Sequence, residues 1–135
     1  MQYIGFVGSS KADKADVTAI LKSITSKLKE YSSADTTIVS GGGEGIDTMS
    51  IEVAKKLHFK TIEYKPTSKN WEEYKKRNIQ IANKCDKIVS FALELGTLSK
   101  RHCYHCSRAG RDDNHEKTAG CYTGYKNGNY EVVIV

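Results

Sequence analysis

The sequence contains few of the residues that mark fibrous, secreted or membrane proteins. Among its 135 residues there are one proline, one tryptophan and four cysteines. No apolar run approaches the length of a membrane span, so we expect no membrane association. The first ten residues, MQYIGFVGSS, have no basic n-region and no cleavage signature. We therefore expect no signal peptide and a cytoplasmic location.

The charge is positive but modest, at +5 with 39% hydrophobic and 27% charged residues. This composition suits one soluble domain over residues 1–135, and a homo-oligomer is compatible with it. A basic excess of this size favours an anionic partner such as a nucleotide-like small molecule. The basic residues are scattered over separate segments rather than gathered, which argues against nucleic acid as the partner.

Apolar residues alternate between strand-like runs and helix-like stripes along the chain. The pattern predicts strands at 3–7, 36–40, 59–64, 86–91 and 130–135, and helices over 17–31, 46–57 and 71–85. Strands that alternate with helices imply an α/β fold. We expect a Rossmann-like three-layer sandwich, with helices on both faces of a five-stranded parallel sheet of order 3-2-1-4-5.

Glycine and serine follow the first two predicted strands. Ligands of such sheets bind beyond the carboxyl ends of the strands, near the switch point. The candidate ligand residues there are Gly8, Ser9, Ser10, Ser40, Gly41, Gly42, Gly43 and Gly45. Bare backbone amides and a following helix N-terminus suit a phosphate group. The alternative is a tight strand-to-helix turn that needs glycine for packing, because neither the P-loop nor the dinucleotide pattern is present.

Three segments together resemble the SLOG superfamily of Rossmann-like domains, which includes DprA-like, lysine-decarboxylase-like (LOG) and YspA-like proteins. They are IGFVGSS, TTIVSGGGEGIDTMS and KKRNIQIANKCDKIVSF. The resemblance covers residues 1–98 and implies that nucleotides or their derivatives bind at the glycine-rich turns. The residues that match the family's motifs are Gly8, Ser9, Gly41, Gly42, Gly45, Asp47, Arg77, Asn78, Gly96 and Thr97.

LOG enzymes cleave nucleoside monophosphates and carry a P-G-G-x-G-T-x-x-E signature after the fourth strand. In this sequence only Gly96 and Thr97 match that signature, and Lys100 stands where the glutamate would be. The resemblance therefore does not supply the catalytic carboxylate of a LOG-like hydrolase.

Three polar residues of the matched motifs have two interpretations each. Asp47 either orients a ribose hydroxyl or caps the helix that follows the glycine turn. Asn78 lies on an otherwise apolar helix stripe, so it either bonds to a neighbouring loop or reaches the ligand. Arg77 borders that stripe, and it is either a solvated helix residue or a ligand contact.

Three of the four cysteines and one histidine form a cluster in a loop at about residues 99–124, with the spacing Cys103-x2-Cys106-x8-His115-x5-Cys121. Three thiolates and one imidazole are a common tetrahedral set for Zn²⁺. Because four protein ligands leave no open position for water, we expect a structural site. His102 or His105 could replace His115, and a thiol pair or a disulfide is the alternative. Cys85 lies on a helical apolar stripe and is expected to be an inert core residue.

These patterns favour a protein that binds or senses a nucleotide or nucleotide derivative and carries a structural zinc ion. One alternative is a nucleotide-processing enzyme in which Glu44, Asp47 or Glu94 replaces the missing glutamate. The other alternative is a nucleic-acid-binding protein, since the Cys/His loop is basic and carries Tyr104 and Tyr122.

Overall fold

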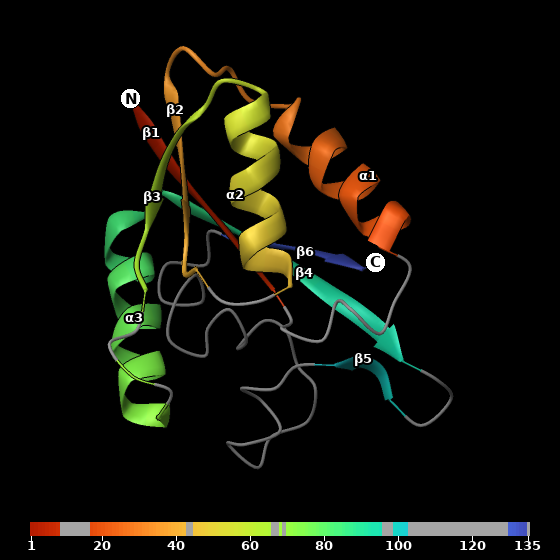
Figure 1. Ribbon diagram of the computed structural model, residues 1–135, viewed down its shortest axis with the longest axis vertical. Helices are drawn as coiled ribbons and strands as arrows, with labels where there is room; N and C mark the ends of the chain where they lie inside the picture. The colour runs from red at the N-terminus through yellow and green to blue at the C-terminus, as the bar shows by residue number, and fades with distance from the viewer. Residues whose placement is uncertain are drawn as a thin grey trace.

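The structure is a computed structural model of the whole chain, shown as a ribbon in Figure 1. It describes residues 1–8, 17–42, 45–65, 68, 70–95, 99–102 and 130–134. Six strands and three helices lie in these ranges. The strands are β1 (Gln2–Gly8), β2 (Thr36–Ser40), β3 (Lys60–Glu63), β4 (Lys87–Leu95), β5 (Ser99–His102) and β6 (Tyr130–Ile134). The helices are α1 (Val17–Leu28), α2 (Ile46–Lys56) and α3 (Trp71–Lys84).

Five of the strands pair in parallel and one is antiparallel. The hydrogen-bonded path runs β3-β2-β1-β4-β5, and β6 pairs with β4 off this path. Strand β6 runs parallel to β4, with Ile88 opposite Tyr130, whereas β5 runs antiparallel to the end of β4, with Leu93 opposite His102. The α/β Rossmann-like fold is confirmed, but the prediction of five parallel strands in the order 3-2-1-4-5 is not. The sheet has six strands, the strand predicted to be fifth is β6, which pairs with β4 off the path, and the path ends in the antiparallel β5.

Strand β5 was not predicted, and it lies inside the segment that we expected to be a Cys/His loop. Its sequence, Ser-Lys-Arg-His, has no apolar residue and therefore no period-two signal. Strand β4 also continues to Leu95, four residues past the predicted end, and this extension is what β5 pairs with.

Helices cover both faces of the sheet. Helices α1 and α2 lie side by side on one face, and α3 lies on the other (Figure 1). Alternation along the strands produces the two cores, because successive side chains point to opposite faces. Ile4 and Phe6 of β1 pack with α1 and α2, whereas Tyr3 and Val7 pack on the α3 side. No helix in the described ranges is long and apolar enough to cross a membrane.

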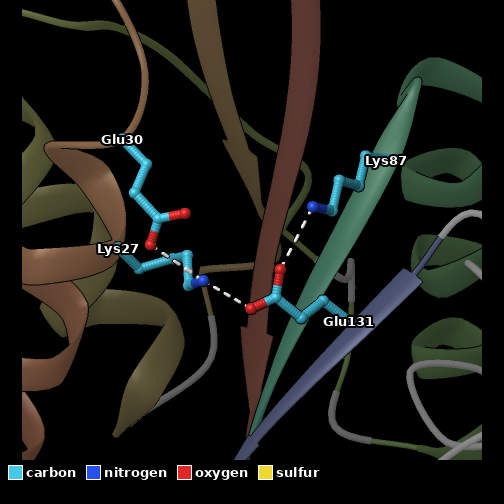
Figure 2. Close-up of polar contacts among 4 residues, drawn as sticks. All are labelled: Lys27, Glu30, Lys87 and Glu131. Carbon is cyan, nitrogen blue, oxygen red and sulfur yellow. Dashed lines mark hydrogen bonds and ion pairs between the residues drawn. The ribbon is translucent and has the colours of Figure 1, made fainter.

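A cluster of charged residues ties the C-terminal strand to α1 and β4. Glu131 of β6 accepts hydrogen bonds from Lys27 at the end of α1 and from Lys87 at the start of β4, the latter at 3.1 Å (Figure 2). Lys27 also pairs with Glu30 at 2.9 Å. The hydrogen bond from Lys27 is the main reason that the pKa of Glu131 is lowered, and partial burial opposes this shift. The cluster lies where β4 and β6 begin, at the amino ends of the strands.

Replacing Glu131 with glutamine should destabilise the protein by about 1 kcal/mol, as expected for a partly exposed charge network. Because the pKa of Glu131 is lowered in the folded protein, its contribution is complete above the ordinary value of 4.5. It is lost as the pH falls through the lowered pKa. Urea unfolding should therefore show the full wild-type advantage at pH 7 and a smaller advantage at pH 3, below the ordinary pKa. A difference that persists unchanged at pH 3 would rule out the ionic origin.

Candidate functional site

The carboxyl ends of β1 and β2 meet at one edge of the sheet. Strand β1 ends at Gly8, which lies opposite Phe91 of β4, and β2 ends at Ser40. The buried Ser40 hydroxyl donates to the Phe6 carbonyl at 2.6 Å, and the Ser40 carbonyl accepts from the Tyr64 amide at 2.9 Å. Ser40 is therefore engaged in holding neighbouring strands together. Its hydroxyl is not placed as a free donor for a ligand.

A buried ion pair crosses this edge. Arg77 of α3 lies 3.5 Å from Asp47 of α2, between Nη1 and Oδ2, and the residues are only 8% and 6% exposed. Each partner also holds a backbone group. The Arg77 Nη1 donates to the Gly41 carbonyl at 2.6 Å, and the Gly8 amide donates to Asp47 Oδ1 at 3.3 Å. Since α2 and α3 cover opposite faces, these contacts connect both helical layers to the ends of β1 and β2.

This geometry decides between the interpretations of Arg77. A solvated helix residue is wrong, because the side chain is buried against Gly41 and Asp47. Asp47 lies in the first turn of α2, as capping would require, but its carboxylate contacts the Gly8 amide and Arg77. Both carboxylate oxygens of Asp47 are therefore in contact with other parts of the chain. The pairing was not foreseen, because Asp47 and Arg77 are far apart in the sequence and share no local pattern.

Gly41 is required by a close approach. The guanidinium of Arg77 packs against its Cα, so an added Cβ would lie 2.7 Å from both Cδ and Cζ of Arg77. Even alanine at this position would displace the arginine or the turn. The glycine is therefore explained by packing, which was the alternative to ligand binding for this turn.

Gly42 is required by its backbone conformation. Its φ is +67°, a left-handed conformation that favours glycine. The aliphatic stem of Lys65 covers it, with Cγ 2.6 Å from the position of an added Cβ. Lys65 follows β3 and was not predicted to approach the turn. Its ammonium lies 3.8 Å from Glu63, and its side chain is 71% exposed.

Helix α2 begins beside these strand ends. Its N-cap residue is Gly45, which offers no side-chain cap. The Gly42 amide makes no hydrogen bond to the described part of the chain. The positive end of the helix dipole and the glycine turn thus adjoin at the predicted edge, an arrangement that suits an anion.

Several predicted site residues lie outside the described residues. They are Ser9, Ser10, Gly43, Gly96, Thr97, Cys103, Cys106, His115 and Cys121. For Asn78 the structure describes the backbone, which lies in α3, and leaves its two interpretations open. No group of three or more metal-ligating side chains occurs within the ranges that the structure describes, and the predicted zinc ligands lie outside these ranges.

Cys85 stands apart from the predicted metal ligands. It ends α3 and packs beside Ile81 and Ile88, in the core on the α3 side. Burial raises the pKa of its thiol to about 12. The thiol is therefore protonated near neutral pH, which makes it a poor nucleophile and a poor metal ligand.

The fold and this edge define a Rossmann-like domain with a glycine-rich turn beside a helix N-terminus. The family model of DNA recombination-mediator protein A matches residues 1–102, and the chain belongs to this family. The match confirms the resemblance to the DprA-like members of the SLOG superfamily. Searches of curated proteins and of solved structures found no significant match.

Replacing Gly41 with alanine should expel the Arg77 guanidinium and destabilise the protein by about 1–3 kcal/mol, the cost of leaving a buried polar group unsatisfied. The same contact is removed by Arg77→Gln. Chemical denaturation of both single variants and of the double variant should therefore give a double-variant loss well below the sum. Additive losses would show that Gly41 and Arg77 act independently.

Proposed function

We propose that the chain binds the phosphate group of a nucleotide or nucleotide derivative at the carboxyl ends of β1 and β2. The observation that carries this proposal is the glycine turn itself. It places the Gly42 amide beside the uncapped N-terminus of α2. Backbone donors beside a helix N-terminus suit an anion, and the exposed Lys65 side chain lies over Gly42. Family membership supports a nucleotide-related ligand.

The charges of the described residues indicate how the anion is held. Arg77 is neutralised by Asp47, and Lys65 lies near Glu63. Backbone dipoles, rather than unpaired cationic side chains, therefore supply the attraction. Binding of this kind displaces few counterions, so its affinity falls only weakly with salt.

DNA or RNA is a second candidate ligand, favoured by the family match. The scattered basic residues led us to expect that nucleic acid is an unlikely partner. The family's name refers to DNA recombination, so the match does not support that expectation. The net charge of +5 is compatible with a polyanion. A bound single strand would neutralise several phosphates and release their counterions, giving a steep salt dependence.

Calorimetric titration with adenosine monophosphate and with a thymidine 20-mer separates these candidates. For the nucleotide we expect binding whose logarithmic salt slope is about −1 or shallower, against about −0.7 per contacted phosphate for a single strand. Gly42→Ala should weaken nucleotide binding at least about tenfold, since it strains the turn. Lys56→Ala, at the far end of α2, is the control and should bind as the wild type does. Absence of nucleotide binding at low salt would reject the first proposal.

We also propose that Cys103, Cys106, His115 and Cys121 bind a structural Zn²⁺. The family match ends at residue 102, directly before the first of these cysteines. The strands on either side of residues 103–129 both pair with β4, so the segment leaves and rejoins the sheet on the same strand. A metal ion would stabilise such an added segment without a large apolar core.

Metal analysis of purified protein should find about one zinc ion per chain, the number that a single tetrahedral site holds. Serine in place of Cys103, Cys106 or Cys121 should abolish retention, and His115→Ala should do so while His105→Ala does not. Cys85→Ser is the matched control, since its half-buried thiol belongs to the core and should leave the zinc content unchanged. Full zinc retention in the triple cysteine variant would reject the site.

A further inference from the structure

The contact between Arg77 and the Gly41 carbonyl has a geometric consequence for the turn. The described peptide bonds include no cis bond, and in a trans peptide the C=O and the following N–H point in opposite directions. The Gly41 carbonyl is directed at the buried guanidinium of Arg77. The Gly42 N–H must therefore point away from that guanidinium.

The burial of the two glycines agrees with this orientation. Gly41 is buried and Gly42 is only partly buried. The carbonyl thus faces the interior, and the amide belongs to the more open residue. The amide makes no hydrogen bond to the described part of the chain, so no contact there competes with a bound anion.

Asp47 keeps the guanidinium in place. It pairs with Arg77 through Oδ2 while its Oδ1 accepts from the Gly8 amide, which belongs to the end of β1. An unpaired arginine would be costly at this depth, so the carboxylate makes the buried position tenable. The orientation of the Gly41–Gly42 peptide, in the turn after β2, therefore depends on α2 and α3, which lie on opposite faces of the sheet.

We propose that Arg77 is a positioning residue that sets the Gly41–Gly42 peptide so that its N–H faces the ligand, with Asp47 holding Arg77 in register. The ligand part of this inference rests on the proposed function. The orientation part does not, because it concerns the free protein. Arg77 acts through the peptide and not by contacting the phosphate.

Nuclear magnetic resonance can observe this peptide selectively. Protein labelled with ¹³C′ and ¹⁵N in glycine alone gives HNCO signals only where two glycines are adjacent. Among the eleven glycines this occurs at Gly41–Gly42 and Gly42–Gly43. In the absence of ligand, Arg77→Gln should change both the ¹³C′ and the ¹⁵N chemical shift of the Gly41–Gly42 signal.

Lys76→Gln is the matched control for charge. Lys76 is the preceding residue of α3, is exposed, and pairs on the surface with Glu73. The substitution Lys76→Gln removes the same unit of charge as Arg77→Gln, but at a residue that does not contact the turn. It should therefore leave the HNCO signals in place and change the affinity for adenosine monophosphate less than twofold.

Arg77→Lys tests the ligand part, because Nη1 makes both contacts, with the Gly41 carbonyl and Asp47, and the lysine side chain is one bond too short to place its nitrogen there. In folded protein we expect its affinity for adenosine monophosphate to fall about tenfold, which corresponds to one hydrogen bond to a charged group. If Arg77→Gln does not fold, the double variant Asp47→Asn with Arg77→Gln buries no unpaired charge and takes its place.

The outcomes separate this inference from the proposed function. Unchanged HNCO signals in a folded Arg77 variant overturn the positioning role. A moved signal with nucleotide affinity within twofold of wild type overturns the link between the peptide and the ligand. Wild-type protein that does not bind adenosine monophosphate rejects the proposed function, while a moved signal would still support the orientation of the peptide by Arg77.

Discussion

The buried pair between Asp47 and Arg77 is the constraint on which the candidate site depends. Burying two charges costs free energy that their attraction offsets only when further hydrogen bonds satisfy both groups. Here the Gly8 amide and the Gly41 carbonyl supply such bonds. The pair thereby joins the ends of two strands to helices from both faces. The proposed orientation of the Gly41–Gly42 peptide rests on this network.

The two ends of the sheet use charge differently. At the carboxyl ends the Asp47–Arg77 ion pair is buried and holds backbone groups of β1 and of the turn after β2. At the amino ends Glu131 lies between Lys27 and Lys87 and attaches the last strand to α1 and β4 (Figure 2). These contacts add to the backbone pairing of β6 with β4, which completes the parallel sheet although 27 residues separate β6 from β5.

Membership in the DNA recombination-mediator protein A family brings the two candidate functions together. A nucleotide and a nucleic acid both present phosphate, and the glycine turn suits that group in either. What differs is the number of phosphates that cationic side chains contact, which is why electrostatics rather than shape separates the candidates. The sequence departs from the LOG signature, with Lys100 in place of its glutamate.

Local patterns in the sequence were enough to predict the α/β class, the three helices and the strands of the parallel sheet, because apolar periodicity reports which face of an element is buried. The glycines after the second strand located the turn, and the resemblance to the SLOG superfamily indicated Asp47 and Arg77 as candidate residues. Local patterns did not predict strand β5, because Ser-Lys-Arg-His has no apolar residue. Only its pairing with the extended β4 makes this segment a strand. The tertiary structure alone decided that Arg77 is buried against Gly41 and paired with Asp47. Such contacts join residues far apart in the chain, and no periodicity encodes which buried charge will meet which.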